Sequence, residues 1–190
     1  AATAVVVNNV KCYGDANGSV KYTISGFGNN TAYSYVINGT GTAVTGTSPV
    51  TGTSFDILRS GLSAGAQDMT ITNTATACTA TATATVAQPT AALAISAPTI
   101  TPITCTANAT AVINTTGGWG TNSFTVTGPS PATTTVTQSN KTFTNLTAGD
   151  YIGAVTDMNG CTDSIPFTIA PVVAIVASID PSSDYCYVSP

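Results

Sequence analysis

The chain has 190 residues, 43% of them hydrophobic, with four basic and eight acidic side chains and a formal net charge of −4. So few Lys and Arg residues cannot neutralise a row of phosphates, which excludes nucleic-acid binding. The chain is too hydrophobic and too weakly charged to be disordered. No run reaches the roughly 20 apolar residues of a membrane-spanning helix. We therefore expect a folded protein without a membrane span.

Short runs rich in Thr, Val, Ile and aromatic residues predict β-strands along the whole chain. The first set covers residues 4–10, 19–25, 32–38, a weak strand around 42–46, then 54–58, 68–73 and 80–86. The second set covers residues 109–115, 122–127, 133–138, 141–146, 150–157 and 163–169. Turns rich in Gly, Asn and Pro separate them. Strands this short and closely spaced are typical of an immunoglobulin-like β-sandwich in an all-β protein.

The two sets of strands share the same landmarks. Cys12 corresponds to Cys105, GFG (26–28) to GWG (118–120), LSAG (62–65) to LTAG (146–149), and Cys78 to Cys161. Repetition at this spacing indicates tandem copies of one unit. The sequence thus predicts module one at residues 1–90 and module two at residues 91–171.

The LTAGDY segment is typical of the tyrosine corner of such sandwiches, in which a phenol bonds back to the backbone. Tyr151 would fill this role in module two. The same position in module one is Gln67, so the corner there is either absent or made by an amide.

The cysteines are spaced for disulfides. The chain has no CxxC motif and no His, which argues against a zinc or iron–sulfur site. We expect one disulfide in each module, Cys12–Cys78 and Cys105–Cys161, each stabilising its module by roughly 4 kcal/mol through loop closure. Reduced, buried thiols are the alternative. Disulfides would place the protein in an oxidising, extracellular compartment, and Ala1 would then be the start of a processed, secreted chain.

Several motifs together resemble a known family. The segments CYGDANGSV (12–20), LTAGDY (146–151), VTDMNGC (155–161) and a closing IAP (169–171) are similar to those of the SprB-type repeat, which occurs in tandem in very large surface adhesins of gliding bacteria. The resemblance covers nearly the whole chain. It implies a secreted, repetitive cell-surface protein with no enzymatic role.

The residue types disfavour an enzyme. Without His, a nucleophile cannot be activated by an imidazole, and without Glu a pair of catalytic carboxylates would have to be two Asp residues. Asp150 and Asp157 lie at the two ends of one predicted strand. Their odd separation puts them on opposite faces. We expect no catalytic residues and no cofactor.

Two segments read Asp-x-Asn-Gly, like the opening of a calcium loop. They contribute Asp15 and Asn17, and Asp157 and Asn159. Neither continues to the bidentate Glu of a full loop. A tight turn, with Asp capping the backbone and Asn-Gly accepting positive φ, is the alternative to a weak calcium site.

Phe27 and Trp119 occupy corresponding Gly-flanked loops. Each ring could stack on a surface glycan, or it could fold over the end of its sandwich and be buried. Attached glycans are a separate expectation, because Asn-x-Ser/Thr acceptor motifs are frequent. They begin at Asn17, Asn29, Asn38, Asn108, Asn114, Asn140 and Asn145.

The last segment, residues 172–190, repeats the start of a module: an apolar run, a proline break and a cysteine. Its distinguishing residues are Val172, Val173, Ile175, Val176 and Cys186. An unpaired apolar strand would be a liability in solution. It is either the first strand of a further module or a strand donated to a neighbouring subunit. Both arrangements predict copies or repeats joined end to end.

These observations favour a structural repeat segment of an extracellular fibre or cell-surface adhesin. A carbohydrate-binding accessory module of a secreted enzyme and a separately secreted pilin-like subunit are the alternatives.

Overall fold

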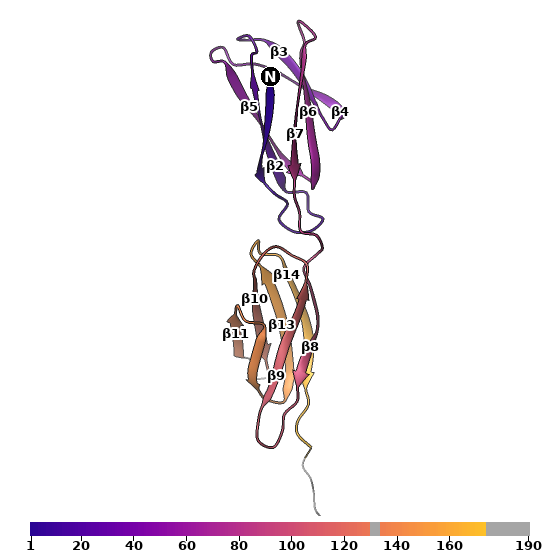
Figure 1. The fold of residues 1–190 in the computed structure, drawn as a ribbon, viewed down its shortest axis with the longest axis vertical. Coiled ribbons are helices and arrows are strands. Elements are labelled where there is room, and N and C mark those ends of the chain that lie inside the picture. Colours follow the sequence, from indigo (N-terminus) through magenta and orange to yellow (C-terminus); the bar gives the residue numbers. More distant parts are fainter. Residues whose placement is uncertain (130–133, 174–190) are drawn as a thin grey trace, which may run out of the picture.

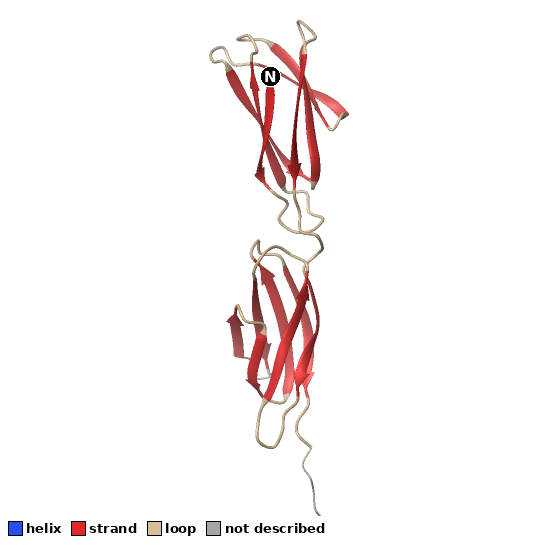
Figure 2. Cartoon of the chain, viewed as in Figure 1, coloured by secondary structure: helices blue, strands red, loops and turns tan. Residues whose placement is uncertain are grey.

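The computed structural model describes residues 1–129 and 134–173. In these ranges all regular elements are β-strands, arranged in two sandwiches that lie end to end (Figures 1 and 2). The described ranges contain no helix of the length and apolarity needed to cross a membrane.

Module one contains two antiparallel sheets. Its strands are β1 (Ala2–Asn8), β2 (Gly18–Ser25), β3 (Ala32–Ile37), β4 (Thr40–Thr47), β5 (Ser54–Leu62), β6 (Gly65–Asn73) and β7 (Thr79–Val86). One sheet has the order β1-β2-β5 and the other β4-β3-β6-β7.

Module two repeats this topology. Its strands are β8 (Ala94–Thr101), β9 (Ala109–Thr116), β10 (Asn122–Gly128), β11 (Thr134–Gln138), β12 (Thr142–Leu146), β13 (Gly149–Asp157) and β14 (Thr162–Ile169). The sheets have the orders β12-β9-β8 and β11-β10-β13-β14. Three strands face four in both modules, with each first strand at a sheet edge beside the second. The predicted all-β class with tandem immunoglobulin-like sandwiches is confirmed.

Each module has its own core, built by residues that alternate along the central strands. In β2 the side chains of Val20, Tyr22 and Ile24 are fully buried. Their counterparts in module two lie on β9. The two buried clusters share no residue, and no sheet contains strands from both modules. The two sandwiches are therefore separately packed.

Strand β8 precedes the first strand predicted for module two, which begins at residue 109, and it is irregular. It carries Pro98, and its register against β9 shifts between Ser96 and Thr99. A proline lacks the N–H that a ladder needs, so it is tolerated at a bulge on an edge strand. β8 is such an edge strand. This irregularity explains why no alternating pattern marked the first strand of module two.

The tyrosine corner is present in module two. The Tyr151 hydroxyl donates to the carbonyl oxygen of Thr147 at 3.0 Å. In module one the Gln67 side-chain amide donates to the carbonyl oxygen of Ser63, also at 3.0 Å and also four residues back. Both side chains are buried. Module one therefore has a corner made by the Gln67 amide in place of a tyrosine phenol.

Candidate functional site at the junction of the modules

The ends of the two sandwiches are set by strand order. Successive strands in each module run in opposite directions, so successive turns alternate between its two ends. The β1–β2 turn of module one therefore lies at the end that faces module two. The β13–β14 turn, the last of module two, lies at the end that faces module one (Figure 1). These two turns carry Cys12 and Cys161.

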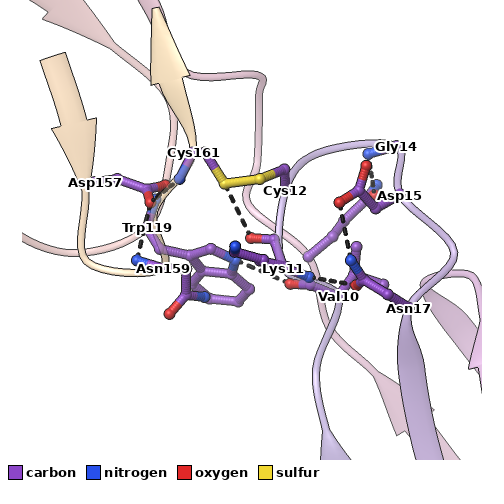
Figure 3. The surroundings of a disulfide bond; sticks show 11 residues. Val10, Lys11, Cys12, Gly14, Asp15, Asn17, Trp119, Asp157, Asn159 and Cys161 are labelled. Carbon is purple, nitrogen blue, oxygen red and sulfur yellow. Dashed lines mark hydrogen bonds between the residues drawn. A yellow bond between two sulfur atoms is a disulfide. The ribbon is translucent and has the colours of Figure 1, made fainter.

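Cys12 and Cys161 form a disulfide across this junction (Figure 3). Their Cα atoms are 5.8 Å apart, within the usual range for a disulfide. The bond connects residues separated by 149 positions in sequence. The Cys161 sulfur also lies 3.3 Å from the Lys11 carbonyl oxygen. Because a bonded sulfur carries no hydrogen, this is a packing contact.

The predicted pairing inside each module is therefore wrong. Cys12 and Cys78 lie at opposite ends of module one, separated by the eight residues of β7. That strand is roughly 26 Å long, whereas the Cα atoms of a disulfide lie within about 7 Å. The same geometry separates Cys105 from Cys161. Cys78 and Cys105 are exposed, and within the described residues neither is bonded.

Trp119 reaches across the junction from the β9–β10 loop. Its indole Nε1 donates to the carbonyl oxygen of Val10 at 3.1 Å, and its backbone N–H donates to Asp157 Oδ2 at 2.9 Å. The preceding Gly118 has φ of +72°, and a Cβ there would lie 2.9 Å from Leu93 Cδ1. Glycine is thus required for the loop to pass this closely and present the indole to module one.

Asp157 organises the module-two side of the junction. The side chain is 5% exposed, and Oδ1 accepts the backbone N–H groups of Asn159 and Cys161, each at 2.9 Å. Burial raises the pKa of the Asp157 carboxyl, but backbone N–H donors lower it by more, so the net pKa lies below its ordinary value. These donors are Trp119, Cys161, Asn159 and Gly160. One ionised carboxylate therefore fixes both the cysteine and the tryptophan.

The module-one side is a loop closed by its own hydrogen bonds. The Lys11 N–H donates to Asn17 Oδ1 at 2.7 Å, and Asn17 Nδ2 donates to Asp15 Oδ2 at 2.9 Å. The Asp15 N–H donates to the carbonyl oxygen of Cys12 at 3.0 Å. The cysteine is thereby presented from a preorganised turn.

The linker between the modules is tied to the same loop. The Val10 N–H donates to the Ala87 carbonyl oxygen at 2.9 Å, and the Ala87 N–H donates to Asn9 Oδ1 at 2.9 Å. The Gly14 N–H donates to Gln88 Oε1 at 3.1 Å. Both the disulfide and the linker therefore connect the modules.

The four calcium candidates lie on the two sides of the junction as turn residues. Asp15 and Asn17 bond each other, and Asp157 bonds backbone N–H groups, as the turn interpretation expects. Nowhere in residues 1–129 and 134–173 do three or more His, Cys, Asp or Glu side chains gather closely enough to hold a metal.

The two candidate aromatic residues are placed differently. Phe27 is half-buried at the far end of module one, edge-on to Tyr33 and Phe55 with ring centroids 6.2 and 5.9 Å away. Phe27 therefore folds over the end of its own sandwich, one of the two placements that the sequence left open. Trp119 is half-buried at the junction.

The tail leaves module two at its far end. Val172 and Val173 are exposed beyond β14. Ile175, Val176 and Cys186 lie outside the described residues.

Sequence reasoning missed Val10 as the partner of Trp119 and Asp157 as the organiser of the junction. The signal available in the sequence was the alternation of the turns: in a sandwich whose seven successive strands alternate in direction, the first and the sixth turn lie at opposite ends. That rule alone separates Cys12 from Cys78.

No protein-family model matches the chain, and no curated protein matches it. Among solved structures, the chain is similar to the C-terminal 282-residue fragment of intimin, solved in complex with the intimin-binding domain of the translocated intimin receptor (Tir). The identity is 14% and the TM-score 0.44, over 90% of this chain and 63% of the fragment. The chain thus spans less than two thirds of the length of the fragment.

Proposed function

We propose that the chain is a structural segment of an extracellular surface protein, an adhesin or fibre, in which sandwich modules are held end to end. The observation that carries this proposal is the Cys12–Cys161 disulfide. It joins the facing ends of two separately packed modules, so it restricts their relative motion without adding to either core. A spacer or stalk needs this property, whereas a binding pocket does not.

The disulfide also supports the proposed location. Structural disulfides persist in oxidising surroundings and are rare in the cytosol. The resemblance to SprB-type repeats of surface adhesins agrees with this location and remains part of the proposal.

The placement of two acids supports the proposal of a non-enzymatic role. Asp150 is exposed at one end of β13, and Asp157 is buried at the other end, bonded to backbone. These two carboxylates therefore do not converge on one point, as the pair in a hydrolase would. We propose no catalytic residue and no cofactor.

The placement of the two rings favours structure over glycan binding. Trp119 is half-buried with its N–H bonded to the Val10 carbonyl oxygen, and Phe27 packs against two aromatic neighbours. Both rings thus have structural partners within the chain, as rings that contribute to packing do. We therefore do not favour the carbohydrate-binding alternative.

The proposal is tested on cells that produce the protein. An antibody against the purified chain should label intact cells as strongly as permeabilised ones. Labelling that requires permeabilisation would contradict a surface location. In parallel, small-angle scattering should give one narrow, extended distribution of interatomic distances for the oxidised chain, and a broader one for Cys161→Ser. Identical distributions would contradict the role of the disulfide in holding the modules.

A further inference from the structure

Among the residues that the structure describes, two cysteines take no part in the junction, and they lie at the outer ends of the two sandwiches. Cys78 is in the β6–β7 turn, at the end of module one that carries Ala1. Cys105 is in the β8–β9 loop, at the end of module two from which the tail leaves (Figure 1). Both are exposed.

Cys78 occupies the same position in module one as the disulfide-bonded Cys161 occupies in module two. Both follow the sixth strand of their module, and the turns are closed alike: the Asn73 N–H donates to the Cys78 carbonyl oxygen at 2.9 Å, and the Asp157 N–H donates to that of Cys161 at 3.0 Å. In each turn the side-chain oxygen of Asn73 or Asp157 accepts two backbone N–H groups. The turn at the outer end of module one thus repeats the one that presents Cys161 to its partner.

Cys105 occupies the same position in module two as the disulfide-bonded Cys12 occupies in module one. Each stands four residues beyond the last residue of its module's first strand, Asn8 or Thr101. Each belongs to a loop closed by local bonds, which in module two include the Thr104 N–H donating to the Ala107 carbonyl oxygen at 2.9 Å. The outer end of module two therefore repeats the loop that presents Cys12.

We propose that Cys105 of one copy forms a disulfide with Cys78 of a second copy, head to tail, in the arrangement that Cys12 and Cys161 adopt inside the chain. This inference rests on the proposed function, and it identifies a second copy of the chain as the partner at each outer end. The contact joins two different surfaces, so it does not close on itself after one step and continues into a linear array. The chain supplies both halves of the contact.

The noncovalent interactions between copies are weaker than those at the internal junction. Phe27 stands where the internal junction has Trp119, and its ring lacks the N–H that bonds the Val10 carbonyl. It is also held by Tyr33 and Phe55 within its own module. Association between copies therefore depends on oxidation.

The bond forms by thiol–disulfide exchange with a small-molecule disulfide such as oxidised glutathione. The thiolate of one cysteine attacks a sulfur of that disulfide, forms a mixed disulfide and expels one small thiolate. The thiolate of the second copy then attacks the protein sulfur of the mixed disulfide and expels the other. Two protein thiols are oxidised, the small disulfide is reduced to two thiols, and the two protons pass to the expelled thiolates.

The test uses the full chain with Cys186→Ser, which removes the tail thiol. In this background, Cys78→Ser offers only Cys105, and Cys105→Ser offers only Cys78. In a glutathione redox buffer each variant alone should remain a monomer of about 18.9 kDa. Their mixture should give a covalent dimer that grows no further, and the chain with both cysteines should give a ladder of higher species.

Three outcomes would overturn the inference: no dimer in the mixture, dimers of either variant alone, or a dimer whose peptides link other cysteines. Circular dichroism and an intact Cys12–Cys161 bond establish that the variants are folded. Monomers that keep this internal bond would defeat the array and leave the surface-segment proposal standing. Failure of intact-cell labelling would defeat that proposal instead.

Discussion

The indole Nε1 of Trp119 donates a hydrogen bond to the carbonyl oxygen of Val10, which lies 109 residues earlier in the chain, over 3.1 Å. Trp119 is the only tryptophan in the sequence. Its fluorescence therefore reports on the junction alone, and on neither core.

Reducing the Cys12–Cys161 bond should move the Trp119 emission to longer wavelength while far-UV circular dichroism stays constant. Without the bond, the junction is held only by a few hydrogen bonds, and small contacts between domains permit relative motion. The indole then meets water more often, whereas both separately packed cores persist. Cys161→Ser should show the shifted emission without reductant. An unshifted spectrum on reduction, or loss of the β-sheet signal, would contradict this account.

Tyr151→Phe should lower the free energy of unfolding of module two by about 1 kcal/mol, because it deletes the partly buried hydrogen bond to the Thr147 carbonyl. This corresponds to a fall of roughly 4–8 °C in melting temperature for a domain of this size. Tyr13→Phe is the matched control: Tyr13 is 48% exposed, and its change should stay within about 0.5 kcal/mol. Equal effects of the two substitutions would show that the corner does not stabilise the module.

Stability should be nearly independent of pH between about pH 5.5 and pH 7.5 and should fall in acid. The chain has neither His nor Glu, so none of its groups has an ordinary pKa inside that window. The folded-state pKa of Asp157 is depressed. Its stabilisation is therefore present above the unfolded value of about 3.9 and is lost as the pH falls through the folded value.

Thermal melts of the wild type and Asp157→Asn separate this carboxylate from the other acids. The variant should be less stable at neutral pH, because an amide offers one oxygen where the carboxylate offers two. Its stability should also fall less between neutral pH and about pH 3. Parallel acid profiles for the two proteins would mean that Asp157 is not the titrating group.

The fold was predictable because it depends on local pattern. Alternation along β2 and β13 places buried residues on one face, and the LTAG segment places Tyr151 at a corner. For module one, the sequence left two possibilities, because a Gln at the corner position is compatible both with an amide that makes the corner and with no corner at all. Strand β8 was not predicted because Pro98 and the register shift beside it interrupt the alternating pattern.

The junction was not predictable from pattern alone. Cysteine spacing shows that Cys12 and Cys78 each border a strand, but not which end of the sandwich each occupies. Only the alternation of turns through all seven strands decides that. The partner of Trp119 depends further on how two modules meet, which no motif within one module contains.

The most direct test of the account is a non-reducing tryptic map of the purified chain, with free thiols blocked beforehand. Trypsin cuts after Lys11, Lys21, Arg59 and Lys141, which separates Cys12 in peptide 12–21 from Cys78 in 60–141 and Cys161 in 142–190. In the tryptic digest, the account predicts peptide 12–21 linked to 142–190. Further digestion with chymotrypsin, which cuts after Tyr151 and Phe167, should place the link in 152–167 and separate Cys161 from Cys186. Peptide 12–21 linked to 60–141 would contradict it.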